Sequence, residues 1–227
     1  MCEQEVRLWS ACLNVSDCMC PPRLGGSKEK DEETLKDATN VLQQMLSDQN
    51  IPSDVIAKAD CVIVLPNVKK VGFLVGGSGG RGPMFCRRNS TGKWSAPAMY
   101  SIGGVSAGLQ VGGSSSDYVL LLMNEKGVNA ILNGKTELGK DATATAGPSG
   151  ATAASVGGSD ILTYKRTKGL FAGVSLGGAS LEPDNDANQR LYGKSISAQE
   201  IVQANAVPTP SAAQEMVSLL DSKYAKN

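Results

Sequence analysis

Residues 61–88 read CVIVLPNVKKVGFLVGGSGGRGPMFCRR, which are β-branched, apolar runs joined through a glycine-rich middle. Short runs of valine, isoleucine and leucine bounded by glycine or proline predict β-strands, here at 61–68, 71–76 and 83–88. The short connections between them favour antiparallel pairing. This stretch therefore predicts the centre of an antiparallel sheet.

Further strand-like segments follow this stretch. They are predicted at 94–100, 105–113, 118–123, 135–146, 161–165 and 171–182, with a hairpin turn at 89–92. The chain has 26 glycines, and glycine within strands accommodates bends, bulges and close backbone contacts. We expect an α+β fold with a strongly curved, mainly antiparallel, glycine-rich sheet, open or barrel-like, packed against amphipathic helices.

Helical periodicity lies on both sides of the predicted sheet. From Lys28 to Asp48 apolar residues recur at helical spacing, and the polar positions are mainly acidic, so this helix is expected to pack on the core rather than bind anionic lipid. Shorter helices are predicted at 53–59 and 124–132. We expect residues 1–27 to be a disordered or processed segment and 28–205 to form one domain. Residues 206–227 are a proline linker with a last helix that docks or stays loose.

Charge is unevenly distributed along a chain whose 22 basic and 22 acidic side chains balance. Because the net charge is zero, no long-range attraction to nucleic acid is expected. Residues 61–110 contain no acidic residue, and their basic residues are Lys69, Lys70, Arg81, Arg87, Arg88 and Lys93. These residues form one cationic surface for an anionic membrane, or they are solvated strand ends that lie among acids from elsewhere in the fold.

The chain contains no histidine, so it lacks the commonest general base and metal ligand. The Cys18-Met19-Cys20 segment is only a weak metal signal. Cys61 and Cys86 lie in apolar strands, either as buried thiols or, in an oxidising compartment, as a disulfide. We expect no catalytic residue, no metal site and no cofactor.

Several motif-like patterns lack the structural context that their chemistry needs. The G-x-S-x-G pattern occurs at 76–80, 104–108 and 173–177, with no histidine to activate the serine. G-x-G-x-x-G at 77–82 precedes a strand rather than a helix, although its turn with Arg81 could hold one phosphate. Residues 134–141 miss the P-loop by one position, and 184–195 lack the glycine and glutamate of a calcium loop.

Two longer runs are much more specific. They are KWSAP at 93–97 and TKGLFAGVSL at 167–176. With CVIVLP at 61–66, GFLVGG at 72–77, GLQVGG at 108–113, AGP at 146–148 and LYG at 191–193, their order and spacing over residues 30–203 resemble the lipid-binding SYLF domain. Agreement over most of a chain is far more specific than any single short motif. The residues of these motifs are similar to those of the bacterial branch of the family.

The resemblance implies non-enzymatic binding of acidic, phosphoinositide-like phospholipid headgroups at a membrane surface, with actin binding known in the fungal branch. The alternative is a structural or protein-interaction module that self-associates or binds a filament. We expect a peripheral membrane protein, exported to the periplasm or cell envelope if a signal precedes Met1 and otherwise cytoplasmic. The candidate lipid contacts are Lys69, Lys70, Arg81, Arg87, Arg88, Lys93, Lys165, Arg166 and Lys168.

Overall fold

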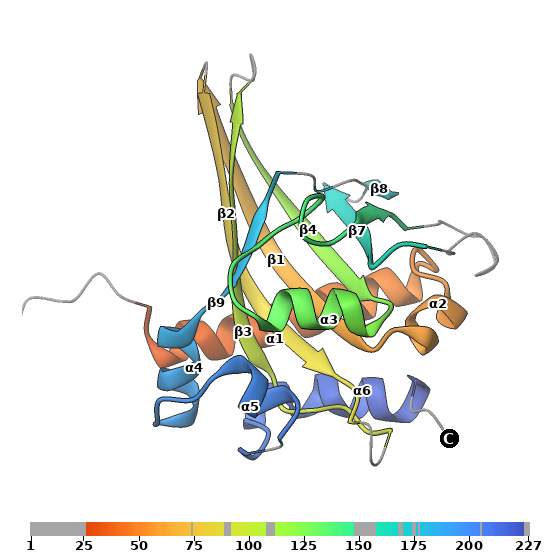
Figure 1. Ribbon diagram of the computed structural model, residues 1–227, viewed down its shortest axis with the longest axis vertical. Coiled ribbons are helices and arrows are strands. Elements are labelled where there is room, and N and C mark those ends of the chain that lie inside the picture. The colour runs from red at the N-terminus through yellow and green to blue at the C-terminus, as the bar shows by residue number, and fades with distance from the viewer. Residues whose placement is uncertain are drawn as a thin grey trace, which may run out of the picture.

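The structure is a computed structural model that describes residues 26–73, 75–88, 92–107, 112–147, 158–167, 170–173, 176, 178–204 and 206–224. Within these residues nine strands form one curved sheet with helices on both faces (Figure 1). The four long strands are β1 (Cys61–Phe73), β2 (Val75–Cys86), β3 (Ala98–Ala107) and β4 (Gly112–Leu122). The shorter ones are β5 (Thr136–Glu137), β6 (Ala144–Ala146), β7 (Ile161–Thr167), β8 (Leu170–Gly173) and β9 (Ser180–Pro183).

The strand order is β5-β9-β3-β2-β1-β4-β7-β6, and β8 also pairs with β7. Every described pair of strands is antiparallel except β6 with β7. The predicted α+β class and the curved, mainly antiparallel sheet are therefore confirmed.

Several predicted strands are shorter or divided. The predicted strand 71–76 falls partly at the end of β1 and partly at the start of β2, and 105–113 is shared in the same way by β3 and β4. The segment 94–97 is not regular strand, because Trp94 makes only an isolated bridge with Arg87 and β3 begins at Ala98. The predicted strands 135–146 and 171–182 are each interrupted near a glycine with left-handed φ, Gly139 at 89° and Gly178 at 83°. Residues that need a positive φ end the extended conformation of a strand.

Six α-helices lie in the described chain. They are α1 (Lys28–Ser47), α2 (Ser53–Lys58), α3 (Glu125–Leu132), α4 (Asn185–Tyr192), α5 (Ala198–Val202) and α6 (Gln214–Tyr224), with a 3₁₀ turn, η2 (Ser211–Ala213), before α6. Ser27 caps α1 by accepting a hydrogen bond from the Lys30 N–H. The last helix, α6, is docked, since Met216, Leu220 and Tyr224 are buried. None of the described helices is long and apolar enough to span a bilayer.

The sheet separates two apolar clusters because alternate residues of a strand point to opposite faces. On β1, Cys61, Ile63 and Leu65 pack with α3 and α5, and we call this side the α3 face. Val62 and Val64 pack with α1, α2, α4 and α6 on the opposite side, the α1 face. Both faces of the sheet are therefore buried near the helices.

The curvature depends on glycines in β2 beside a bulge in β1. The β1–β2 register shifts between Ile63 and Lys69. A Cβ at Gly80 would lie 2.7 Å from Val68 Cγ2, and one at Gly82 would lie 1.8 Å from the Val64 carbonyl oxygen. Only glycine allows the two backbones to approach this closely, as expected for glycine in a curved sheet.

Cys61 and Cys86 are opposite each other in the β1–β2 register and are joined in a disulfide. Both are buried. Of the two states that the sequence left open, the structure therefore has the bonded one, at the end of the strands nearest to the helices.

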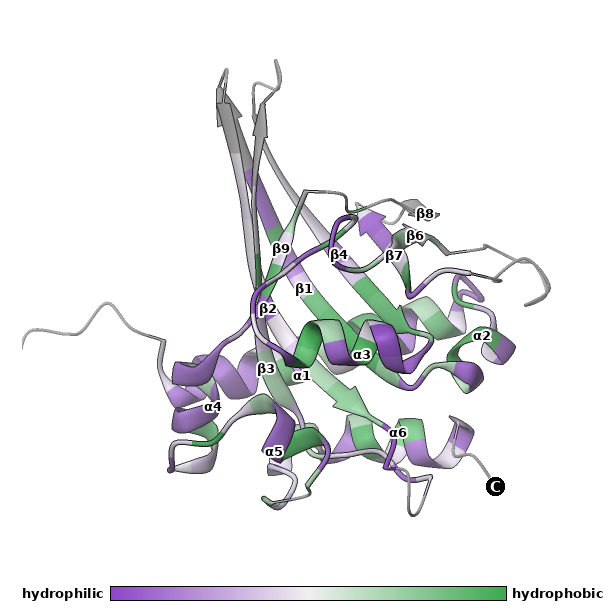
Figure 2. Ribbon diagram, viewed as in Figure 1, coloured by the Kyte–Doolittle hydropathy of each residue, from purple (hydrophilic) through white to green (hydrophobic). Residues whose placement is uncertain are grey.

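The far ends of β1–β4 project past the helices (Figure 1). We call residues 69–73, 75–79, 103–107 and 112–115 the extension; their inner limit is the row in which Lys69 pairs with Gly79 and Ser115, and Gly79 pairs with Gly103. Its sequence consists largely of glycine, serine and valine with two lysines and no acid. The strongly apolar part of the strands lies between the helices instead (Figure 2). The extension thus continues the hydrogen-bonded sheet with a sequence poorer in large apolar residues.

Candidate lipid-contact surface

The predicted basic residues of the acid-free segment are spread along the length of the sheet. Lys69 and Lys70 lie on β1 in the extension, with Lys69 opposite Gly79 of β2. Arg87 lies eight residues further along the chain from Gly79, and at about 3.3 Å per residue this separates the two levels by roughly 26 Å. The acid-free segment therefore does not form one continuous cationic surface.

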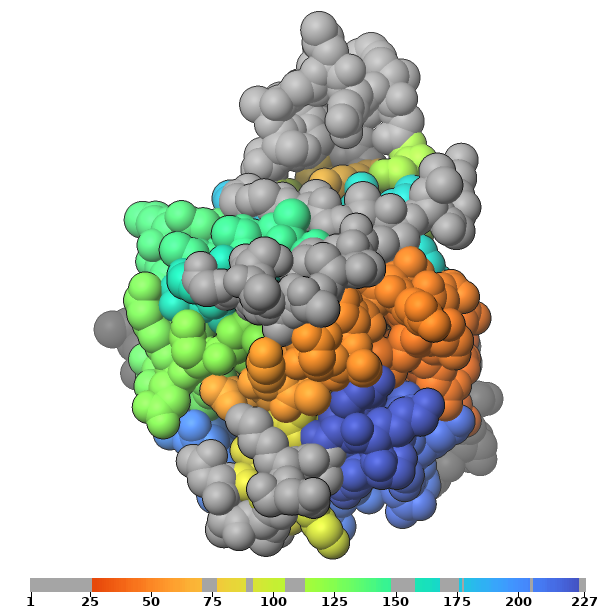
Figure 3. Space-filling view, turned by 90° about the vertical axis from the view of Figure 1, so that its right-hand side faces the viewer, coloured from red at the N-terminus to blue at the C-terminus, as the bar shows by residue number. Residues whose placement is uncertain are grey.

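The Arg87 side chain is buried and is not available for contact with a membrane. It is only 9% exposed, and its guanidinium lies 4.4 Å from the centre of the Trp94 ring. Burial lowers the pKa of Arg87, although Asp60 and Asp221 counter this effect. Figure 3 shows α6 in blue against the orange α2 segment, the two helices whose ends Arg87 joins. The guanidinium donates to the carbonyl oxygens of Ile56, Ala57, Ala59 and Tyr224.

Arg81 is neutralised by acids from two helices. Its Nη1 atom lies 3.3 Å from Asp31 Oδ1 on α1 and 3.4 Å from Asp184 Oδ2 at the N-cap of α4. Arg190 also binds Asp31, with Nε 2.7 Å from Oδ2, and these hydrogen bonds raise the pKa of Arg190. Asp31 is fully buried. This cluster was not predicted from the sequence. The one available signal was the helical spacing that places Asp31 on the same buried face of α1 as Leu35, because a buried acid needs cationic partners.

Arg166 is also paired. Its Nη2 atom lies 2.9 Å from Asp117 Oδ2, and its Nη1 donates to Gln44 on α1. Lys165 points to the opposite face, where its Nζ lies 6.0 Å from the centre of the Tyr118 ring. Lys165 forms no ion pair with another described residue.

Lys69 is exposed and Lys70 is half-buried, and neither forms an ion pair within the described ranges. At the other end of the sheet Lys93 is exposed and Arg88 is half-buried. Lys168 lies outside the described residues. Of the predicted contacts, Lys69, Lys70 and Lys165 thus lie on β1 and β7 near the extension without an ion pair to a described residue.

The KWSAP motif has a structural role in this fold. The Ser95 hydroxyl accepts from the Cys86 N–H at 3.0 Å and donates to the Ala96 carbonyl at 2.9 Å. The Trp94 N–H donates to Asp221 on α6 at 2.8 Å. Residues 94–97 are buried and join β2 to the last helix, whereas Lys93 at the start of the motif is exposed.

Ser78 and Asp184, from two of the enzyme-like and metal-like patterns, have ordinary structural roles, whereas Cys18-Met19-Cys20 lies outside the described residues. Ser78 lies within β2 rather than on a strand-to-helix turn, and its hydroxyl donates to the Gly104 carbonyl at 3.4 Å. Asp184 caps α4 by accepting from the Ala187 N–H at 3.0 Å. No group of three metal-binding side chains occurs in the part of the chain that is described.

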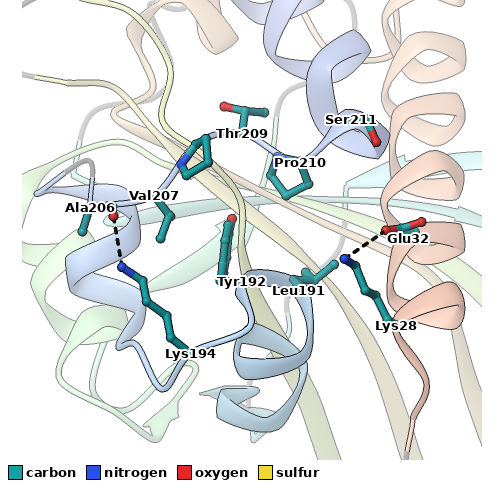
Figure 4. Close-up of a pocket in the computed structure, with 11 residues that line it drawn as sticks. Lys28, Glu32, Leu191, Tyr192, Lys194, Ala206, Val207, Thr209, Pro210 and Ser211 are labelled. Atoms are coloured by element: carbon teal, nitrogen blue, oxygen red, sulfur yellow. Dashed lines mark hydrogen bonds and ion pairs between the residues drawn. The ribbon is translucent and has the colours of Figure 1, made fainter.

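A pocket lies between the start of α1, the end of α4 and the linker that precedes α6 (Figure 4). Its volume is about 270 Å³. Lys28 lies 4.0 Å from Glu32, and Lys194 donates to the Ala206 carbonyl at 3.3 Å, so both cations at its rim have partners. Leu191 and Tyr192 form part of its wall.

Residues 103–223 match the model of a family described as "Ysc84: Las17-binding protein actin regulator". The chain belongs to the Ysc84 family. This result confirms the resemblance to the SYLF domain, which rested on motifs distributed over residues 30–203. Members of the Ysc84 family are named as regulators and SH3-containing proteins rather than as enzymes.

The sequence is similar to Ysc84-family proteins of animals and fungi. It is 34% identical over 207 residues to SH3 domain-containing YSC84-like protein 1 of Homo sapiens, covering 89% of this chain and 60% of the human protein. It is 33% identical over 210 residues to Protein YSC84 of Saccharomyces cerevisiae, covering 89% of this chain and 44% of the yeast protein. The Ysc84-family chain therefore spans less than two thirds of these relatives.

Proposed function

We propose that this protein binds acidic phospholipid headgroups at a membrane surface, without catalysis, through Lys69, Lys70 and Lys165. The observation that carries the proposal is that these three lysines have no ion pair with a described residue and lie near an extension whose sequence contains no acid. Arg81 and Arg166 are instead neutralised by carboxylates, and Arg87 is buried. Lys168 follows Thr167 in sequence and belongs to the proposal as a prediction.

The charge of the remaining molecule favours an approach with the extension first. No acidic residue occurs from Cys61 to Ser116, whereas the exposed side of α1 includes Glu29 and Glu33. A cation near an anionic bilayer contributes about 1 kcal/mol, so three lysines would supply roughly 3 kcal/mol. Salt screens such attraction over about 8 Å at physiological ionic strength, so binding should weaken at high salt.

The test is co-sedimentation with phosphatidylserine vesicles and with neutral vesicles, at low and high salt. The variant K69E/K70E/K165E should bind the anionic vesicles at least a hundredfold more weakly, because about 3 kcal/mol of attraction is lost and repulsion is added. The control K30E/K36E/K58E changes the net charge equally at exposed lysines of α1 and α2. Equal binding by both variants would reject the proposed surface, and no binding by the unmodified protein would reject the function.

A protein-binding function is the second candidate, favoured by the relatives' names and by open strand edges. β7 pairs with β4 only at Asp117–Leu122, so residues 112–116 have no described partner strand on that side. Such edges accept an additional strand. This alternative would be supported if the protein sediments with actin filaments even at high salt and does not bind vesicles. Peripheral membrane localisation follows from the lipid proposal, and export to the periplasm stays a prediction.

A further inference from the structure

One edge of the extension lies open at β4. This strand (Gly112–Leu122) pairs with β1 from end to end, whereas β7 pairs with it only from Asp117 onward. At the point where β7 leaves, Ser116 Oγ lies 2.7 Å from Thr167 Oγ1. Among the described residues, no strand therefore pairs with residues 112–116 on the side away from β1.

The direction of the backbone groups on β4 follows from the hydrogen bonds at its helix end. The Leu122 carbonyl accepts from the N–H of the residue before β1, and the Met123 N–H donates to the carbonyl of the residue before β7. Successive residues of an antiparallel strand direct their backbone groups to alternate sides. The bulge between β1 and β4 adds its extra residue to β1, so this alternation continues through β4. Gly113 and Ser115 therefore direct their N–H and C=O groups to the open edge.

This edge lacks the features that protect most edge strands from pairing, which are charged side chains, proline and bulges. Residues 112–116 read GGSSS, and Gly113, Ser114 and Ser115 are exposed. Side chains this small do not block the approach of another strand. Gly113 and Ser115 together offer such a strand two N–H donors and two carbonyl acceptors.

Two lysines flank this open edge and lie on opposite faces of the sheet. Lys69 of β1 is opposite Ser115, and Lys70 follows it, so Lys69 points to the α1 face and Lys70 to the α3 face. Neither forms an ion pair with a described residue. The acid next to the edge, Asp117, is already held by Arg166, with Oδ2 2.9 Å from Nη2. The charge beside the edge is therefore positive on both faces.

This charge selects among the chains that could pair with β4. An added strand would lie about 10 Å from β1, two strand spacings away, which a lysine and a glutamate side chain extended towards each other can span. Acids at two adjacent positions would then face one lysine each. The same edge of a second copy carries no acid at 112–116 and would bring its own Lys69 and Lys70, so charge disfavours pairing between copies.

We propose that the β4 edge, residues 112–116, is a docking site for an acidic, extended segment of a partner protein, which adds to the sheet as a further strand. Main-chain hydrogen bonds to Gly113 and Ser115 supply the affinity, as in other cases of strand addition, and Lys69 and Lys70 select acidic side chains. This site does not depend on the membrane function. Because both use the same two lysines, an acidic strand and an anionic membrane compete for the protein.

The probe is the capped, fluorescein-labelled hexapeptide Thr-Val-Glu-Glu-Val-Thr, whose binding is measured by fluorescence anisotropy. The unmodified protein should bind it at least tenfold more tightly than the matched peptide with two lysines in place of the glutamates. N-methylation of both glutamates removes a donor from each edge of the peptide but keeps its charge, and should weaken binding at least tenfold. A purely electrostatic contact would not distinguish the methylated peptide.

The variant S115P tests the edge from the side of the protein. Proline removes an N–H that faces the open edge rather than β1, so the β1–β4 ladder keeps its hydrogen bonds. S115P should bind the glutamate peptide roughly tenfold more weakly, while S115A, the matched control that keeps the N–H, should bind it normally. Both variants should sediment with phosphatidylserine vesicles as the unmodified protein does. If S115P melts early, the methylated peptide still gives the test, because it needs no change in the protein.

The outcomes separate this site from the membrane function and from self-association. No binding of the glutamate peptide at millimolar concentration, or equal binding of the methylated peptide, would overturn the docking site and leave the membrane function standing. Peptide binding of the expected pattern, in a protein that binds no vesicle, would support the site and reject the membrane function. A dimer of the unmodified protein that is lost in S115P would overturn the acidic partner and assign the edge to a second copy.

Discussion

Near the helices, β1–β4 carry apolar side chains on both faces, whereas in the extension the same strands are rich in glycine and serine. Val62 and Ile63 are fully buried on opposite faces, but Gly77 and Gly79 are exposed. Sheet stability depends mainly on side-chain packing rather than on the hydrogen-bonded ladder alone. The comparison shows that one continuous sheet can form a core at one end and carry exposed residues such as Gly77, Gly79 and Ser115 at the other.

The largest expected effect is on a glycine of the packed half. In Gly82→Ala the new Cβ would lie 1.8 Å from the Val64 carbonyl oxygen, so the β1 or β2 backbone must move. We expect a loss of about 3 kcal/mol or more in the free energy of unfolding, measured by urea denaturation. Gly77→Ala in the extension is the control, because nothing lies within 4 Å of that Cβ. Equal stability of both variants would contradict the division of the sheet.

A second large effect is expected at Arg87, at the helix end of β2. Arg87→Met retains an apolar stem beside Trp94 but leaves the carbonyls at the ends of α2 and α6 without their donor. Removal of charged hydrogen bonds to buried groups should lower the free energy of unfolding by about 3 kcal/mol. Arg88→Met, which removes the neighbouring guanidinium, is the control. Vesicle binding by folded Arg87→Met should be unchanged. A loss of vesicle binding in Arg87→Met but not in Arg88→Met would show that Arg87 belongs to the contact surface.

An intermediate effect is expected at Asp160, which is 4% exposed. The Thr143 backbone N–H and hydroxyl, Lys126 and Asn124 all donate to this carboxylate, and they hold its pKa well below the usual value. Its stabilisation is therefore complete above the unfolded pKa of about 3.9 and is lost as the pH falls towards the lower folded pKa. Asp160→Asn should cost about 2 kcal/mol at pH 7.

The pH dependence is the critical measurement for Asp160. Urea unfolding between pH 7 and pH 2 should show the difference between Asp160→Asn and the unmodified protein shrinking below pH 4. Glu33→Gln, at an exposed position of α1, is the control and should change stability little. A gap that stays constant down to pH 2 would show that Asp160 acts through its shape rather than through its charge.

Local patterns in the sequence predicted the elements of the packed half, but not the partners of its charges. The periodicity of Leu35 and Leu42 predicted α1, and the apolar run from Val62 to Leu65 predicted the first part of β1. The pairing of Asp31 with Arg81 and Arg190 joins residues 50 and 159 positions apart, which local patterns do not relate. The separation of Lys69 from Arg87 likewise depends on the length of β1 and β2 and on the bulge near Asn67, a residue with a φ of 52°.

The smallest expected effect is a gain of stability in the extension. Gly77 needs neither positive φ nor close packing, so Gly77→Thr should add about 0.5 to 1 kcal/mol through strand propensity and reduced freedom of the unfolded chain. Urea denaturation measures the gain, and vesicle sedimentation shows whether the side chain interferes. If stability rises and vesicle binding is unchanged, the glycine at position 77 only lowers the stability of the extension and makes no contact with the membrane. If stability rises and binding falls, the bare backbone at Gly77 is itself a contact, because a partner must come closer there than a side chain allows.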